Sequence, residues 1–169
     1  MLSFTFLILQ KTELQDKFGE RIYNSYEPYG LLTIELDKNS IKEVLQFLYD
    51  HKELQMQFLT DVCGIHYPQI VGKELGVVYH VHSLINNIRL RIKCFMPIEN
   101  PAIDSATFLF SSANWQERET FDFYGIIFIG HPNLKRILNA DEMDYFPMRK
   151  EYPLEDGTRT DKDDSYFGR

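Results

Sequence analysis

Residues 75–95 read LGVVYHVHSLINNIRLRIKCF, two apolar runs joined by a short polar segment. Apolar and basic residues alternate along the second run, with Ile88, Leu90, Ile92 and Cys94 on one side and Arg89, Arg91 and Lys93 on the other. Alternation with a period of two is typical of a strand with one buried face. Because Ile85, Asn86 and Asn87 favour a turn, the runs predict a hairpin over 75–84 and 87–95. Its apolar face is expected in the core, and its basic face open or covered by a partner.

The segment before this hairpin has the pattern of two strands followed by a helix and a third strand. Strand-like runs at 20–27 and 30–36 precede Ser40 and Glu43, which have the spacing of a capping box. The next apolar residues recur with helical spacing: Ile41, Val44, Leu45 and Leu48. We therefore expect an amphipathic helix after Ser40, and then a strand over 54–60.

The beginning of the chain predicts a short helix preceded by an extended segment. Thr12 is a plausible N-cap for a helix through residue 18, and Gly19 is expected to close it in the left-handed conformation. Residues 1–9, MLSFTFLIL, lack the basic region and the cleavage site of a signal peptide. We interpret them as a short edge strand or docking segment.

Two helical segments are expected after the hairpin. The first runs from Asp104 or Ser105 to near Ser111, and the second is capped by Asn114 and ended by Gly125. The element order is then α-β-β-α-β-β-β-α. This order predicts an α+β fold, a two-layer sandwich with a mostly antiparallel or mixed sheet.

Length and composition restrict the possible functions. The 169 residues suffice for one core-forming domain. With 18 basic and 25 acidic residues the net charge is −7, which argues against general nucleic-acid binding. Two cysteines are too few for an iron–sulfur cluster and favour a reducing compartment. Since the sequence has no apolar run of the roughly 18 residues that a membrane span needs, membrane association is expected only through other subunits.

One group of residues has the chemistry of metal ligands: Cys63, His66, His80, His82 and Cys94. His80 and His82 would share one strand face, as two metal ligands do. The alternation, however, places Cys94 on the apolar face, where a free cysteine behaves as a small hydrophobic residue. Ordinary strand residues are the favoured interpretation, and a metal site is the alternative.

Sequence motifs for nucleotide binding and for nucleophilic catalysis are absent. Glu117, Glu119 and Asp122 have the chemistry for general acid–base catalysis, but no nucleophile accompanies them. The basic row of the hairpin is also compatible with an RNA-binding sheet, although that face carries no ring for base stacking. We therefore expect no catalytic residue, bound cofactor or metal in this chain.

The stretch ERETFDFYG, residues 117–125, mixes charge and aromatic rings on every stripe of a helix. Arg118 and Asp122 are spaced i, i+4 and could form either an exposed pair or a buried one. An isolated surface helix normally separates charged from aromatic residues. The mixture therefore predicts either that the charges are paired in a buried network or that more than one side of the helix is covered, and in both cases a buried junction.

The last 29 residues, 141–169, carry nine acidic and five basic residues. Pro147 and Pro153 prevent a long helix there, and the segment has too few apolar residues for its own core. It is either a disordered tail or an arm laid on another protein, and its aromatic rings favour the arm: Tyr145, Phe146, Tyr152, Tyr166 and Phe167. We divide the chain into an α+β domain, 1–130, and an extended C-terminal arm, 131–169, that docks on partner subunits.

ERETFDFYGIIFIGHPNLKRIL, residues 117–138, followed by PMRKEYP, residues 147–153, resembles the signature of the 30 kDa subunit, or C subunit, of the proton-pumping NADH:quinone oxidoreductase. This enzyme is respiratory complex I. DVCGIHYP at 61–68 and VVYHVHSL at 77–84 extend the resemblance to roughly residues 20–155. The departures are mild: Asn133 stands in place of Asp, Lys135 of Arg, Met148 of Leu, and Phe146 of a small or polar residue.

The resemblance implies a cofactor-free structural subunit of the peripheral arm, in the quinone module. Its implied neighbours are the quinone-reducing subunit and iron–sulfur subunits, at the cytoplasmic face of the bacterial inner membrane. The whole enzyme is implied to pass electrons from NADH through FMN and iron–sulfur clusters to a quinone and to translocate protons. A related membrane-bound hydrogenase or ferredoxin-linked complex is the alternative setting.

The resemblance and the mixed helix together imply roles in assembly for the motif residues. A hydrogen-bonded charge network is expected from Glu117, Arg118, Glu119 and Asp122. Backbone turns are expected at Gly125 and Gly130, and a rigid corner at His131 and Pro132. Contacts with partner subunits are expected from Arg136, Arg149 and Lys150, and the interface set is completed by Phe121, Tyr152 and Pro153.

Overall fold

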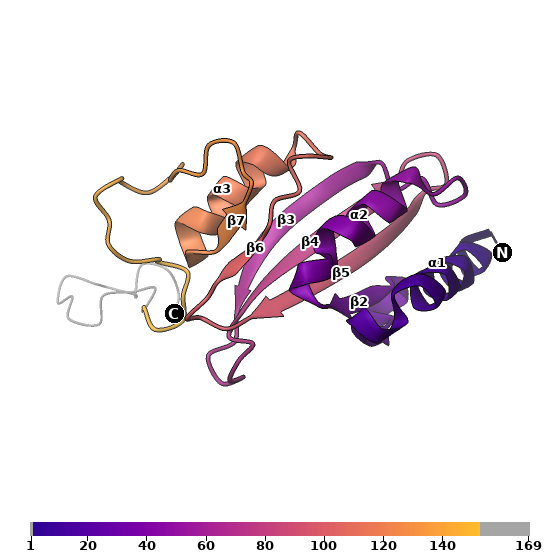
Figure 1. Ribbon diagram of the computed structural model, residues 1–169, viewed down its shortest axis with the longest axis horizontal. Coiled ribbons are helices and arrows are strands. Elements are labelled where there is room, and N and C mark those ends of the chain that lie inside the picture. Colours follow the sequence, from indigo (N-terminus) through magenta and orange to yellow (C-terminus); the bar gives the residue numbers. More distant parts are fainter. Residues whose placement is uncertain (1, 153–169) are drawn as a thin grey trace, which may run out of the picture.

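A mixed sheet of five strands, ordered β1-β2-β5-β4-β3, forms the centre of the fold (Figure 1). The computed structural model describes residues 2–152. The strands are β1 (Ile22–Tyr26), β2 (Thr33–Leu36), β3 (Phe58–His66), β4 (Leu75–Ser83) and β5 (Ile88–Met96). Strands β2 and β5 run parallel, and every other neighbouring pair in this sheet is antiparallel. The predicted α+β class with a mixed sheet is confirmed.

Three helices and a small second sheet accompany the central sheet. The helices are α1 (Leu2–Phe18), α2 (Ile41–Asp50) and α3 (Ala113–Tyr124), and short 3-10 turns lie at Gly19–Arg21, Pro28–Gly30 and Lys38–Ser40. The second sheet pairs β6 (Ala102–Asp104) in parallel with β7 (Ile127–Ile129). In Figure 1, α2 lies across the central sheet, whereas α3, β6 and β7 are grouped beside β3.

The β4–β5 hairpin supplies much of the core, as its alternation predicts. Tyr79 faces Ile92 across the hairpin, and both side chains are fully buried. Arg89 on the opposite face is exposed, and Arg91 and Lys93 are half-buried. The predicted amphipathic helix is also confirmed as α2, whose four predicted apolar residues are at most 1% exposed: Ile41, Val44, Leu45 and Leu48. Burial of these side chains is the main stabilising contribution of the helix.

The N-terminal segment differs from the prediction. Residues 2–18 form one continuous helix, α1, so the expected edge strand within 1–9 is wrong. Leu14 and Phe18, one helical turn apart, are buried in the core and hold the helix against the domain. Gly19 continues into a 3-10 turn and does not adopt a left-handed φ. Glycine is a common C-cap residue, but the 3-10 turn that follows α1 does not require a left-handed residue at position 19.

The strand expected over 54–60 begins later, at Phe58. The imidazole of His51 accepts hydrogen bonds at Nδ1 from the backbone N–H groups of Glu53 and Leu54, both at 3.2 Å. This caps the end of α2 with a tight turn. Leu54 and Met56 belong to the segment between α2 and β3, and both side chains are fully buried. The strand-like alternation of these residues therefore comes from a loop that packs on the core.

The helix expected from Asp104 or Ser105 to Ser111 is also wrong. That region contains the end of β6 followed by turns. The backbone N–H of Ser105 donates to the carbonyl of Ile129, which continues the pairing with β7. Pairing with a strand more than 20 residues later prevents helix formation at this point.

Helix α3 lies along the outer edge of β3. Two of its side chains and that of Ser112, the residue before it, are spaced four residues apart and approach carbonyl oxygens of that strand: Ser112 to Leu59, Gln116 to Thr60 and Thr120 to Val62, at 3.4, 3.4 and 3.5 Å. At these distances the hydrogen bonds are weak, and the contacts mainly show that the helix lies against the strand. The helix therefore covers a strand edge that would otherwise be open to pairing with another chain.

Among residues 2–152, no helix has both the length and the apolar character that a membrane crossing requires.

Gly64→Ala tests the contact between α3 and β3. A Cβ at residue 64 would overlap the ring of Tyr124, so we expect the free energy of unfolding to fall by about 1–3 kcal/mol. Urea denaturation of the full chain measures this. Tyr124→Leu in the same chain makes room for the methyl group and is expected to reduce the added cost of Gly64→Ala. An unchanged unfolding free energy in the single variant contradicts the close packing.

Candidate functional site

The carboxylate of Asp122, near the end of α3, is fully buried and enclosed by the arm. Its Oδ2 accepts hydrogen bonds from the backbone N–H groups of Ile137, Leu138 and Asn139 at 3.0, 2.8 and 2.9 Å. Its Oδ1 accepts from Arg136 Nη1 at 2.7 Å and from Asn139 Nδ2 at 3.0 Å. One side chain of the helix thus fixes the backbone of a turn 14 to 17 residues later.

These contacts determine the charge of Asp122. Burial by itself raises the pKa of a carboxyl group, because it penalises the charged form. Here the three backbone N–H donors and the Arg136 guanidinium outweigh burial and hold the pKa of Asp122 far below its usual value. Asp122 is therefore ionised at neutral pH and forms a buried ion pair with Arg136.

Arg136 joins three parts of the chain. Its Nη1 also donates to the Asp122 carbonyl at 3.0 Å, and its Nη2 donates to the carbonyls of Met143 and Tyr145 at 2.7 and 3.0 Å. Its guanidinium carbon lies 5.1 Å from the centre of the Phe146 ring. The sequence predicted a partner contact for Arg136, but its guanidinium is bound within the chain and its side chain is only 9% exposed.

Arg118 does not pair with Asp122, although the two are spaced i, i+4. Its Nε and Nη2 donate to the carbonyls of Lys135 and Arg136 at 3.1 and 3.0 Å, and it lies over the ring of Trp115. The four expected motif charges therefore do not bond to one another directly. In the described residues Glu117 binds the turn after β6, Glu119 is exposed, and Arg118 and Asp122 are linked through Arg136, whose carbonyl accepts from Arg118 and whose guanidinium donates to Asp122. Arg118 and Asp122 instead hold the same turn of the arm from two sides.

Glu117 is a second fully buried carboxyl group on α3, and its surroundings differ from those of Asp122. Its Oε2 accepts from the Ser105 hydroxyl and its Oε1 from the Ala106 backbone N–H, both at 2.6 Å. Burial raises the pKa of Glu117 to about 7, and these two hydrogen bonds offset only part of that effect. Glu117 thus joins the first half of α3 to the turn that follows β6.

The described part of the arm, 131–152, follows α3 from the start of the helix to its end. The backbone N–H of Met148 donates to the Phe123 carbonyl at 3.2 Å, and Arg149 Nε donates to the Tyr124 carbonyl at 2.8 Å. The backbone N–H of Lys150 donates to Nδ1 of the buried His66 at 3.0 Å. Arg149 is therefore engaged within the chain, whereas Lys150 and Tyr152 are exposed. Pro153 lies outside the described residues.

The turns of the motif have the conformations that require glycine. Gly125 ends α3 with φ 74°, the left-handed cap that the sequence predicts, and Gly130 has φ 84°. A ring nitrogen of His131, Nε2, lies 3.0 Å from the Asn114 carbonyl, and its Nδ1 accepts from the Asn133 N–H. His131 thus connects the arm to the start of α3.

Near the end of the helix, the ring of Phe121 packs edge-on against Phe146 of the arm.

Large apolar side chains are exposed on α3, β7 and the arm. We call this group the arm surface: Trp115, Ile127, Ile129, Leu138, Tyr145, Met148 and Tyr152, which are 38% to 66% exposed. Exposed apolar groups on adjoining elements are typical of protein–protein contacts. The aromatic rings of the C-terminal segment pointed to Tyr145 and Tyr152 in the sequence. The missed signal for Ile127 and Ile129 was the continuous apolar run over 126–129: as a strand it buries Phe128 and leaves its two neighbours exposed.

The residues with metal-ligand chemistry are dispersed. Cys94 is fully buried on the core face of the sheet, where burial raises the pKa of its thiol, whereas His80 and His82 are on the opposite face. Burial and the nearby Asp61 raise the pKa of Cys63 to about 11. Within residues 2–152, no three His, Cys, Asp or Glu side chains are grouped as metal ligands.

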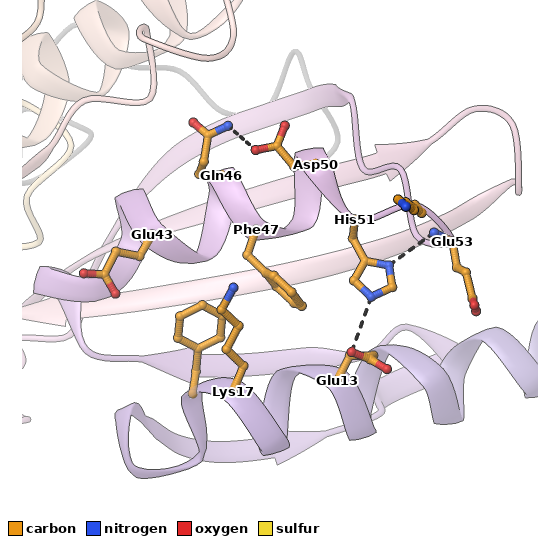
Figure 2. A pocket seen from close by; sticks show the side chains of 10 residues that line it. Glu13, Lys17, Glu43, Gln46, Phe47, Asp50, His51 and Glu53 are labelled. Carbon is orange, nitrogen blue, oxygen red and sulfur yellow. Dashed lines mark hydrogen bonds and ion pairs between the residues drawn. The ribbon is translucent and has the colours of Figure 1, made fainter.

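A cavity of about 770 Å³ lies between α1 and α2 (Figure 2). Phe18 and Phe47 form its apolar part, and Lys17 Nζ lies 4.1 Å from the centre of the Phe47 ring. His51 Nε2 faces a Glu13 carboxylate oxygen at 3.3 Å, while its Nδ1 caps the turn after α2. Since His51 and Lys17 are already engaged with neighbours in the chain, we assign this cavity no chemistry.

Residues 34–158 match the protein family described as respiratory-chain NADH dehydrogenase, 30 Kd subunit. A C subunit of NADH-quinone oxidoreductase from Rhizobium etli is 39% identical over 147 residues, which are 86% of this chain and 77% of the relative. The C subunit of the same enzyme from a Nocardioides species is 42% identical over 125 residues, 74% of this chain and 50% of that relative. The chain thus spans about half of the Nocardioides protein.

Two solved structures have a similar fold. A trypsin-resistant fragment of Nqo5 has a TM-score of 0.64 at 28% identity, over 74% of this chain and 98% of the fragment. A chain of the membrane-bound sulfane sulfur reductase, an archaeal respiratory membrane complex, has a TM-score of 0.73 at 17% identity, over 89% of this chain and 86% of that chain. At that identity, the second similarity establishes the fold alone.

Asp122→Asn is expected to lower the free energy of unfolding by about 3–5 kcal/mol at pH 7, because it leaves the buried Arg136 without its counter-charge. Urea denaturation measures the change, with Arg118→Ala as the matched control, expected to cost less because within residues 2–152 the Arg118 guanidinium donates to backbone carbonyls and forms no ion pair. Because the pKa of Asp122 is lowered on folding, its stabilisation is present above its usual pKa of 3.8 and is lost as the pH falls below that value. Equal losses in the two variants contradict the central role of Asp122.

Glu117→Gln tests the other buried carboxyl group through pH. The pKa of Glu117 rises on folding from its usual 4.5 to about 7, so its contribution to stability is present below pH 4.5 and is lost as the pH rises to about 7. We expect the wild type to lose unfolding free energy over this range relative to Glu117→Gln. Parallel curves of unfolding free energy against pH for the two proteins contradict the raised pKa.

Proposed function

Because the chain belongs to the family of the 30 kDa subunit of respiratory-chain NADH dehydrogenase, we propose that it is a structural subunit of NADH:quinone oxidoreductase. In this role the chain contributes no catalytic group. It binds neighbouring subunits of the peripheral arm and holds them in position. Electron transfer from NADH to quinone, coupled to proton translocation, is then carried out by the other subunits.

The observation that carries this proposal is the exposed arm surface, together with the hydrogen bonds that fix the arm on α3 and β3. The turn at 136–139 is bound to Asp122, and residues 148–150 are bound to α3 and to His66 of β3 by one backbone hydrogen bond and two that involve a side chain. Exposed apolar side chains such as Leu138 and Ile129 therefore belong to a fixed surface. A preformed surface loses little conformational entropy on binding, which favours stable association.

The partners follow from the same proposal. We assign FMN and the iron–sulfur clusters to partner subunits, and the arm surface to contacts with the quinone-reducing subunit and an iron–sulfur subunit. The arm, 131–169, supplies most of these contacts, and Lys150 and Tyr152 are its exposed motif residues. The complex would hold this chain peripherally at the cytoplasmic face of the bacterial inner membrane.

A second setting is a related respiratory complex with a different electron donor or acceptor. The shared fold with a chain of the sulfane sulfur reductase favours this candidate, since that protein also belongs to a respiratory membrane complex. The position of the arm surface would be the same in both settings. The subunits that co-purify with the chain distinguish them.

Leu138→Asp tests the proposed docking. Leu138 is 66% exposed and is the most exposed member of the arm surface, so we expect the variant chain to fold, and a charge at this position to reduce co-purification with the other subunits at least about tenfold. The measurement is affinity purification of the tagged full chain from membranes in mild detergent. The matched control is Ile85→Asp, since Ile85 is 73% exposed in the turn between β4 and β5.

The subunits recovered with the wild-type chain decide between the settings. FMN-containing and quinone-site subunits support NADH:quinone oxidoreductase. A nickel–iron subunit or a sulfur-reducing subunit in their place supports the related complex. Equal recovery with Leu138→Asp and Ile85→Asp contradicts docking through the arm surface, and a wild-type chain recovered alone contradicts the proposed function.

A further inference from the structure

The face of the central sheet opposite the apolar residues of the hairpin carries an ordered set of charged and polar groups. We call it the basic sheet face; its charged and polar members include Tyr26, Glu35, Asp61, His80, His82, Arg89, Arg91 and Lys93. Asp61, His80 and Arg91 are direct neighbours across β3, β4 and β5. This face is distinct from the arm surface, which lies on α3, β7 and the arm.

The guanidinium of Arg91 is held in a fixed orientation. Its Nε donates to His80 Nε2 at 2.8 Å, and His80 Nδ1 lies 3.4 Å from Asp61 Oδ2. Because Nε2 accepts a hydrogen bond, the ring proton is on Nδ1 and faces Asp61. Within residues 2–152, no hydrogen bond or ion pair engages the two terminal nitrogens of Arg91. These nitrogens form a planar pair of donors, which matches the two oxygens of a carboxylate.

The neighbouring cations differ in how far they are neutralised. Lys93 Nζ donates to the Tyr26 hydroxyl at 3.0 Å, and that hydroxyl donates to Glu35 Oε1 at 3.2 Å. Arg89, two residues before Arg91 on the same strand, is exposed and makes no ion pair in the described part of the chain. Arg89 and Arg91 therefore form a positive pair on a chain whose net charge is −7.

We propose that the basic sheet face binds an extended, carboxylate-rich segment of a neighbouring subunit, with Arg91 and Arg89 as its anchors. Alternate residues of a β-strand project to the same side about 6.6 Å apart, which matches two carboxylates to Arg89 and Arg91. This inference rests on the proposed function, because the neighbour is another subunit of the same complex.

A nucleic acid fits this face less well. Glu35 and Asp61 are placed among the cations, where they would repel a phosphate backbone. A protein segment brings its carboxylates only to Arg89 and Arg91 and avoids that repulsion. The same face also carries Phe58, 45% exposed, which offers apolar contact beside the charges.

The test places a photo-reactive benzoylphenylalanine at Phe58 in the full chain within the purified complex, so that both arginines remain. Phe108 is the matched control site, because it is 44% exposed and lies against Lys42 of α2, away from the basic sheet face. After irradiation, mass spectrometry identifies the attached peptide. We expect Phe58, and not Phe108, to be joined to a peptide of another subunit that carries at least two acidic residues.

Charge reversal tests the anchors separately. Arg89→Glu and Arg91→Glu are each expected to reduce the cross-link at residue 58 at least about tenfold, and Lys52→Glu, on an exposed turn after α2, is expected to leave it unchanged. The side chain of Arg89 makes no hydrogen bond or ion pair in the described residues, so Arg89→Glu remains informative if Arg91→Glu disturbs folding. Replacing the cross-linked acidic residue by Lys is expected to restore the cross-link of Arg89→Glu.

Three results overturn the inference: no cross-link to another subunit at residue 58, a peptide without acidic residues, or attached nucleic acid. Each leaves the proposed function standing as long as the chain is recovered with the other subunits. Loss of the chain from the complex, with every variant and with the wild type, is instead the failure of the proposed function.

Discussion

The buried carboxylate of Asp122 is the group on which the arrangement of the arm depends. A buried charge is costly unless it is paired and hydrogen-bonded, and here nearly all of its partners come from the arm: three backbone N–H groups, the Asn139 amide and Arg136. The converse also holds, because Arg136 and the N–H groups of the turn would lose their acceptor if α3 moved away. Helix and arm therefore require each other, and the exposed apolar groups between them keep a fixed geometry.

Glu117 and Asp122 show how surroundings set the state of a buried acid. Both are fully buried on the same helix, yet the pKa of Glu117 is raised and that of Asp122 is lowered. The difference is the number and charge of the donors: in the part of the chain that the structure describes, Glu117 accepts from one hydroxyl and one N–H and forms no ion pair, whereas Asp122 pairs with Arg136. As a result, α3 is anchored to the turn after β6 by an acid whose pKa is raised to about 7, and near its end to the arm by an ionised one.

Local patterns in the sequence predicted the parts of the fold that depend on near neighbours. The alternation of 88–94 and the spacing of Ile41, Val44, Leu45 and Leu48 gave the hairpin and α2 correctly, and Gly125 marked the end of α3. The partner of Asp122 could not be predicted in this way. Spacing suggested Arg118, four residues before it, whereas Arg136, fourteen residues after it, has a better geometry because the whole turn at 136–139 donates alongside. His51 is a similar case. Its side chain caps the turn after α2, so β3 begins at Phe58 although the strand-like pattern begins at residue 54.

The arm surface and the basic sheet face have different physical properties, and in the proposed assembly they would have different effects. Burial of Leu138, Ile129 and Trp115 would stabilise a contact strongly, but hydrophobic attraction has no preferred direction. A guanidinium held at Nε, as in Arg91, accepts a carboxylate in one plane and contributes to orientation more than to affinity. A protein whose role is to position others needs both properties. A chain with only the apolar surface would bind its neighbours without fixing their orientation, and one with only the charged face would bind them too weakly to remain in a stable complex.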